Sequence, residues 1–339
     1  MGQRETDKIR FPMSQNDPAA LREYLASTAL EGVSEIGRRD LAHYVAHAFP
    51  RFLVTLEFLP RSPGRVLELG ANPYFFTALM KRLRDYELEL ANYYNDDAAP
   101  GDWGEERMVN ERYGERHAFR YRHLNIERDR FPYDDASLDG VLFCEILEHL
   151  TLDPAAALRE MHRVLKPGGW LLVTTPNVSR YELIQRLVAG SGIGDQYSGY
   201  GVYGRHNREY SLLEVRRLVE SQGFDVERIE ARATLPVPQS KLLDALKPFL
   251  GAPEQYQDNL FCLARRADRK PGLRPAWLYR SIAPDEINAN DWLPETLPPV
   301  DAGLQAVRDE NERHRLVLNT RIVRLALRVQ RWLARLRRR

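Results

Sequence analysis

Short apolar runs alternate with amphipathic segments over the middle of the chain. Apolar residues repeat at helical spacing over 21–30 and 36–49, and short β-rich runs then take over. Three more helices are expected, one after Asn72-Pro73, one from Asp153-Pro154 to 165, and one from the Ser211/Glu214 capping box to 221. The predicted strands are 65–69, 86–91, 119–124, 138–143, 170–175, 224–231 and 260–264.

This alternation predicts an α/β fold with a Rossmann-like, doubly wound and mostly parallel sheet of seven strands. Such sheets bind ligands at the C-terminal ends of their strands. We expect four parts: an N-terminal helical cap at 1–60, the sheet domain at 61–266, a linker or wrapping segment at 267–303, and a basic amphipathic C-terminal helix at 304–339.

Charge is distributed unevenly along the chain. The 49 Lys and Arg residues nearly balance the 48 Asp and Glu residues, but residues 313–339 hold ten Arg and no acidic residue. Their apolar residues form a heptad-like stripe. The stripe allows pairing with another copy or packing on the body, contact with an anionic membrane surface, or nucleic-acid binding, which the acidic body disfavours. Its members are Leu318, Ile322, Leu325, Val329, Trp332 and Leu336.

Two other features bear on the location of the protein. No run approaches the roughly 18 apolar residues of a membrane-spanning helix, and residues 1–11 lack an apolar signal core. We therefore expect a cytoplasmic protein, with the basic helix as the part that could touch the inner face of a membrane. Cys144 and Cys262 lie in apolar runs, and their number and spacing fit neither a disulfide framework nor a zinc finger.

Two strings resemble the class I S-adenosylmethionine-dependent methyltransferases. They are Val-Leu-Glu-Leu-Gly-Ala-Asn at 66–72 and the stretch 139–169, which ends in Leu-Lys-Pro-Gly-Gly. The resemblance covers about residues 60–265 and implies a methyl-transferring enzyme with S-adenosylmethionine as its cofactor. It also implies that Gly70 lets the backbone approach the methionine part and that Glu68 holds the amino group. The other implied cofactor residues are Ala71, Asn72, Asn92, Tyr93, Asn125, Ile126 and Cys144.

The chain departs from this family at its cofactor positions. Asn72 and Tyr74 replace the usual second and third glycines of the loop. Asn92 stands where an acidic residue normally grips the ribose, and Asn125 where Asp often lies beside the adenine. An Asn side chain can hydrogen-bond a diol, but without charge. A methyltransferase-like scaffold that has lost its cofactor is therefore the non-enzyme alternative.

A set of acidic and imidazole side chains follows the fourth predicted strand. On a helix, Glu145, Glu148 and His149 would share one face, and His206 comes after the Gly-, Ser- and Tyr-rich residues 190–204. Two carboxylates and two imidazoles predict a site for Mg²⁺ or Mn²⁺. We expect Glu145, His149 and His206 to be the catalytic residues. The alternative is a metal-free site in which one His acts as the base and the other side chains pack.

The set is similar to that of two metal-dependent groups, the small-RNA 3′-terminal 2′-O-methyltransferases and the ubiquinone-biosynthesis O-methyltransferases. The first group is also matched by Thr175-Pro176-Asn177. A metal-bound hydroxyl loses its proton far more easily than a free alcohol, whose pKa is near ~16. The leading expectation is therefore methylation of a hydroxyl on a sugar, glycan or similar polyol. RNA 2′-O-methylation and quinone or phenol O-methylation are the alternatives.

Overall fold

The computed structural model describes residues 17–94, 98–192, 197–198, 201–236, 241–246, 252–279 and 287–288. The chain divides into two compact units. The first comprises Met1–Gln239 and Ala252–Asp291, and the second Ser240–Gly251 and Trp292–Arg339. In the second unit, helix α7 (Lys241–Leu246) is the described part. The predicted basic helix at 304–339, with the partners expected for it, lies outside the described residues.

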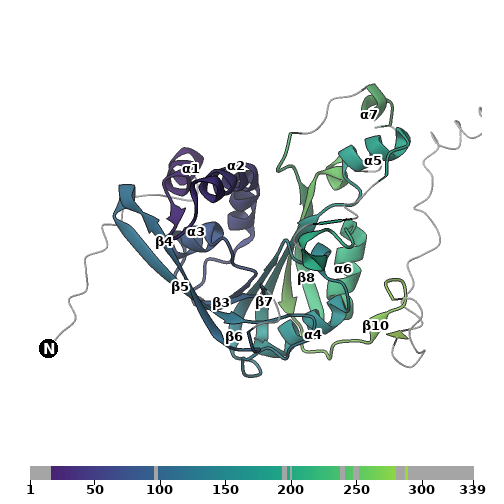
Figure 1. Ribbon diagram of the computed structural model, residues 1–339. Helices are drawn as coiled ribbons and strands as arrows, with labels where there is room; N and C mark the ends of the chain where they lie inside the picture. Colours follow the sequence, from purple (N-terminus) through teal and green to yellow (C-terminus); the bar gives the residue numbers. More distant parts are fainter. Residues whose placement is uncertain are drawn as a thin grey trace, which may run out of the picture. The chain divides into compact units, whose positions relative to one another are not determined.

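The first unit is built on a nine-stranded sheet in the order β1-β4-β5-β3-β2-β6-β7-β9-β8 (Figure 1). From β5 to β7 neighbouring strands are parallel, and β9 is antiparallel to both β7 and β8. The predicted doubly wound, mostly parallel α/β sheet is therefore confirmed. The strands are β1 (Ala29–Leu30), β2 (Gly64–Leu69), β3 (Tyr86–Asn92), β4 (Trp103–Asn110), β5 (Glu115–His123), β6 (Leu138–Cys144), β7 (Leu165–Pro176), β8 (Phe224–Arg232) and β9 (Asn259–Arg266).

All seven predicted strands are present, but the number seven is wrong. Strand β4 pairs antiparallel with β5, and the two-residue β1 pairs with β4. The apolar pattern missed β4 because one of its faces is exposed and carries Glu105 and Arg107. Backbone hydrogen bonds to β5 hold β4 in the sheet, although its side chains show no apolar pattern that would predict a strand. A separate two-stranded pair joins β10 (Arg274–Pro275) to β11 (Ile287–Asn288).

Helices cover both faces of the sheet (Figure 1). Helices α1–α3 share one hydrophobic core with the sheet residues Leu142, Leu172 and Phe261, whereas α4 and α6 pack on the opposite face. None of the described helices is long and apolar enough to cross a membrane. The helices are α1 (Pro18–Ala26), α2 (Glu35–Phe58), α3 (Phe75–Leu83), α4 (Pro154–Val164), α5 (Tyr181–Val188) and α6 (Leu212–Ser221).

Both N-terminal helices differ from their predicted ranges. The first ends at Ala26, because Ala29 and Leu30 pair with β4 instead of continuing the helix. The second runs to Phe58 through Pro50, although a proline inside a helix removes one backbone hydrogen bond. The last turns of α2 bury Phe52, Leu56 and other apolar side chains against the core. This burial outweighs the lost bond, and it places the C-terminal half of α2 beside the sheet.

Part of the predicted linker packs against the domain. The Tyr279 hydroxyl donates to Asp153 Oδ1 at 2.5 Å, and Arg274 Nε donates to Asp153 Oδ2 at 2.7 Å. Asp153 is also the N-cap of α4, and Ala276 and Trp277 are buried. In the described range 267–279, the chain therefore wraps the end of α4.

Candidate functional site

The strand order reverses between β2 and β6, which lie side by side at the centre of the sheet. A reversal of this kind opens a crevice at the C-terminal ends of the two strands. The loops that follow them enclose a pocket of about 300 Å³ together with α2. Its lining includes Tyr44, Arg51, Phe52, Glu68, Gly70, Ala71, Asn72, Tyr74, Cys144, Glu145, Glu148, His149, Thr174 and His206.

The turn after β2 depends on Gly70. Its φ of +64° is in the left-handed region, and a Cβ there would lie 2.9 Å from Ile146 Cδ1. Tyr74 has a similar φ of +66°, which costs a residue other than glycine roughly 1–2 kcal/mol. The Tyr74 ring is fully buried and stacks on Phe119 at a centroid distance of 5.1 Å. This stacking offsets the strain, so Tyr74 can take the place of a glycine.

Asn92 holds this turn in place. Its Oδ1 accepts a hydrogen bond from Asn72 N at 3.1 Å, and its Nδ2 donates to the Tyr74 hydroxyl at 2.7 Å. Its side chain is buried and is not part of the pocket lining. Asn92 therefore positions the turn, a role that the sequence did not suggest. Its contact with a ribose stays a prediction.

A tyrosine from a distant segment covers the loops that follow β3 and β5. Tyr203, in the short helix η3 (Val202–Gly204), lies edge-on to Tyr93 at 5.6 Å between ring centroids. Asn125 Nδ2 donates to the Tyr203 hydroxyl at 3.4 Å. The half-buried Ile126 follows Asn125. Tyr93, Asn125 and Ile126 are not part of the pocket lining, so their cofactor contacts stay predictions.

Glu68, near the end of β2, is a buried carboxyl group that faces the pocket. It is 6% exposed, and Thr77 Oγ1 donates to its Oε2 at 2.6 Å. Burial raises the pKa of Glu68 to about 8, because the charged form loses its hydration. A cationic ligand group in the pocket would lower this pKa again, so Glu68 would ionise as it pairs with such a group.

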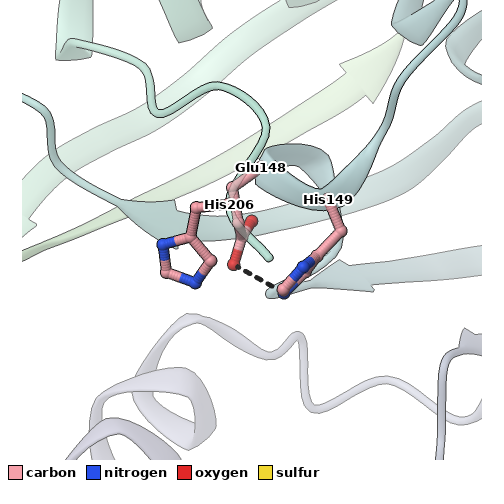
Figure 2. A group of neighbouring side chains, drawn as sticks. All are labelled: Glu148, His149 and His206. Carbon is pink, nitrogen blue, oxygen red and sulfur yellow. Dashed lines mark ion pairs between the residues drawn. The ribbon is translucent and has the colours of Figure 1, made fainter. Parts of the chain in front are cut away.

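Three side chains from two segments converge in the pocket lining, as Figure 2 shows. Glu148 and His149 belong to the short helix η2 (Leu147–His149), and His206 follows η3. Each offers one ligand atom, and the three atoms lie within 4.8 Å of one another. Thr175 Oγ1 donates to Glu148 Oε2 at 2.9 Å, and burial raises the pKa of Glu148 to about 8.

Both imidazole rings are oriented by contacts through Nδ1. His149 Nδ1 lies 2.9 Å from the backbone oxygen of Arg205, and His206 Nδ1 lies 2.8 Å from Glu209 Oε1. Because a carbonyl oxygen can only accept, His149 donates through Nδ1, so Nε2 is the nitrogen that carries a lone pair in the neutral ring. Burial lowers the pKa of His149, which favours this neutral form. Arg180 in turn forms an ion pair with Glu209.

Glu145 does not join this group. The expectation that Glu145, Glu148 and His149 share one helical face is wrong, because Glu145 precedes η2 and has a φ of +54°. Its Oε2 accepts a hydrogen bond from Arg51 Nη1 at 3.0 Å. Its Oε1 accepts from Thr174 Oγ1 at 2.8 Å and from Asn259 Nδ2 at 2.9 Å. Glu145 therefore faces α2 and the neighbouring strands.

Comparison with known proteins agrees with this architecture. Residues 38–229 match the family model described as a methyltransferase domain. The chain belongs to this methyltransferase family. The expected enzyme class, a methyltransferase, is thereby confirmed.

Several known proteins are similar in sequence to part of this chain. A probable S-adenosylmethionine-dependent methyltransferase of Mycolicibacterium smegmatis is 36% identical over 106 residues, 31% of this chain and 35% of that protein. Another from Mycobacterium tuberculosis is 28% identical over 217 residues, 63% of this chain and 68% of that protein. A polyketide synthase-nonribosomal peptide synthetase of Aspergillus clavatus is 27% identical over 251 residues, 70% of this chain and 6% of that protein.

The chain thus spans about a third of the length of the Mycolicibacterium smegmatis relative. Among solved structures, a methyltransferase of Thermotoga maritima described as a possible histamine N-methyltransferase aligns at 16% identity with a TM-score of 0.43. The alignment covers 67% of this chain and 95% of that one.

The structure brings many of the predicted methyltransferase residues to one pocket. Ala71, Asn72 and Cys144 line it with Glu68 and Gly70, and burial raises the pKa of the Cys144 thiol well above its usual range. Arg51 was not among the predicted residues, because α2 was expected to end before it. No role was predicted for Tyr203 or Glu209, which lie within or just after the Gly-, Ser- and Tyr-rich residues.

Proposed function

We propose that this methyltransferase transfers the methyl group of S-adenosylmethionine to a hydroxyl oxygen, with a divalent cation held by Glu148, His149 and His206. The observation that carries the proposal is the convergence of three ligand atoms within 4.8 Å of one another. The same three residues line the pocket that contains Glu68 and the Gly70 turn. The proposed metal ligands and the proposed cofactor residues therefore line one cavity.

The three ligands suit Mn²⁺ better than Mg²⁺, because two of them are imidazole nitrogens and Mg²⁺ prefers oxygen ligands. One carboxylate oxygen and two imidazole nitrogens leave coordination positions for water and for acceptor oxygens. Metal-binding histidines usually donate their second N–H to a carboxylate or a backbone oxygen. Glu209 and the Arg205 carbonyl supply such partners here. A positive charge would also lower the high pKa that burial gives Glu148.

Different residues of the pocket would bind the cofactor and activate the acceptor hydroxyl. Glu68 would pair with the ammonium group of the cofactor, and the Gly70 turn would let the backbone approach its methionine part. A bound cation would lower the pKa of an acceptor hydroxyl. The acceptor oxygen then forms a bond to the methyl carbon while the carbon–sulfur bond breaks. The products are a methyl ether, S-adenosylhomocysteine and a proton released to solvent.

Two neighbouring oxygens on the acceptor would bind such a cation better than one, because both can enter its coordination shell. A sugar, glycan or similar polyol meets this requirement, and we propose this acceptor class. RNA 2′-O-methylation and quinone or phenol O-methylation are tested as separate outcomes. A metal-free transfer, in which His149 or His206 takes the proton, is the competing mechanism for the same residues.

The experiment measures Mn²⁺ binding by electron paramagnetic resonance and S-adenosylhomocysteine binding by calorimetry. We expect one Mn²⁺ per wild-type chain, and its loss in Glu148→Gln and His206→Ala, with cofactor-product binding retained. His43→Ala, at an exposed position of α2, is the matched control. Methyl transfer from labelled cofactor is then assayed on methyl glucosides, catechol and an RNA oligonucleotide, with Mg²⁺ and with EDTA. Full turnover in EDTA would refute the metal.

A further inference from the structure

We infer that Arg51 binds the carboxylate of the cofactor's methionine part, and that Glu145 is a positioning residue that holds Arg51 in the pocket. The inference rests on the methyl-transfer part of the proposed function and is independent of its metal. It gives Glu145 a role different from the metal ligation and catalysis expected from the sequence.

Charge in the pocket is the first argument. Among the described residues that line it, Arg51 is the one Arg or Lys, whereas Glu68, Glu145 and Glu148 are acidic. The methionine part of the cofactor carries an ammonium and a carboxylate group. Glu68 suits the ammonium, and a carboxylate entering the same cavity needs a cation. A guanidinium matches a carboxylate with two parallel hydrogen bonds, so Arg51 suits the other end.

The contact between Arg51 and Glu145 is the second argument. Arg51 Nη1 lies 3.0 Å from Glu145 Oε2, and the two side chains are 19% and 18% exposed. A guanidinium has five N–H donors, so this contact fixes the orientation of the group without using all of them. The pair joins α2 to the end of β6. Glu145 thereby aims a side chain of the helical cap into the cofactor pocket.

The surroundings of Glu145 are the third argument. Its two oxygens together accept hydrogen bonds from Arg51, Thr174 and Asn259, which come from α2, β7 and β9. Its φ of +54° costs about 1–3 kcal/mol, a strain that tends to persist where the side chain must point in one direction. These contacts engage both carboxylate oxygens, and Glu145 is not one of the three residues whose ligand atoms converge. This geometry favours a structural clamp over metal ligation.

The test compares two ligands that differ by one group, S-adenosylhomocysteine and its decarboxylated analogue, both titrated without metal. Wild type should bind the carboxylated ligand at least tenfold more tightly. Arg51→Met should lose this preference, and Arg51→Lys should keep part of it. Glu145→Gln should reduce the preference several-fold and leave Mn²⁺ affinity unchanged. Arg38→Met, at an exposed position on the same helix, is the matched control.

Two results would overturn the inference. A preference that survives in Arg51→Met would show that Arg51 does not bind the cofactor carboxylate. Loss of Mn²⁺ binding in folded Glu145→Gln would make Glu145 the metal ligand that the sequence predicted. If Glu145→Gln does not fold, Thr174→Val removes one bond to Glu145 and should also weaken the preference. An unchanged preference there would equally oppose the clamp.

The proposed metal site and the proposed role of Arg51 can be refuted independently of each other. Glu148→Gln should lose Mn²⁺ and keep the ligand preference, which is the reverse of Glu145→Gln. If wild type binds no Mn²⁺, the metal part of the proposed function is refuted. The carboxylate preference, measured without metal, would still decide the role of Arg51.

Discussion

Binding of S-adenosylhomocysteine should release a proton from Glu68. Burial raises the pKa of this carboxyl group to about 8 in the protein without ligand. At pH 7 a group with that pKa is ionised in roughly one molecule in ten. The ammonium group of the ligand would replace lost hydration with an opposite charge, which lowers the pKa and ionises Glu68. The release should therefore approach about 0.9 proton for each ligand bound at pH 7.

Isothermal titration calorimetry in phosphate, HEPES and Tris measures this release. The observed binding enthalpy varies linearly with the ionisation enthalpy of the buffer, and the slope is the number of protons exchanged. At pH 8, the pKa itself, the released fraction should fall to roughly one half. Glu68→Gln, which cannot ionise, should bind more weakly and show a slope near zero.

Glu148 also has a pKa raised to about 8, so it is the group that could imitate the effect. Glu148→Gln is therefore the matched control and should keep the wild-type slope. A wild-type slope near zero at pH 7 would refute the reasoning, because Glu68 would then be ionised before binding or not meet the ammonium. A slope unchanged in Glu68→Gln would assign the proton to another group.

Three further outcomes follow from the same geometry. Because the folded pKa of Glu68 is raised, the folded state binds the extra proton between the unfolded pKa and about 8, so stability falls as pH rises through this window. Glu68→Gln should therefore match wild type below about pH 4 and exceed it at pH 8 by about 4 kcal/mol in urea unfolding; equal stabilities at pH 8 would contradict this. Gly70→Ala should cost about 1–3 kcal/mol in the same assay, because its φ is +64° and the new Cβ meets Ile146, and it should weaken cofactor-product binding in calorimetry. Glu209→Gln should weaken Mn²⁺ binding about tenfold in a resonance titration, since His206 loses its charged partner; unaltered affinity would exclude Glu209 from orienting a ligand.

Strands whose side chains are buried on both faces were visible in the sequence. Strands β2, β6 and β7 are apolar runs, and their parallel order follows from the alternation with helices. Strand β4 left no such trace, because Trp103, Glu105 and Arg107 are exposed and two of them are charged. Its place was decided by backbone pairing with β5. Helix α2 passes through Pro50 because tertiary burial outweighs a local helix-breaking preference.

In the candidate site, too, some residues could be predicted from the sequence and others could not. Glu68, Gly70, Glu148 and His149 could be named because they follow central strands whose C-terminal ends meet. Arg51 could not be named, since it lies on a helix that was expected to end before it. Its partner Glu145 was assigned to a helical face that does not exist at that position. Asn92 was expected to contact a ribose. In the structure its polar atoms form hydrogen bonds with Asn72 and Tyr74 in the turn that begins at Gly70.

The sequence by itself determined the fold class, the family and the strand ends that carry the chemistry. These follow from local patterns: hydrophobic period, turn residues and the spacing of short motifs. Only the tertiary structure decided which polar atoms converge. The direction of a side chain after a strand depends on one residue's φ, as at Glu145, and ion pairs such as Arg51–Glu145 join residues 94 positions apart. No periodic signal in the chain encodes such a pair, because it forms only once burial has brought its elements together.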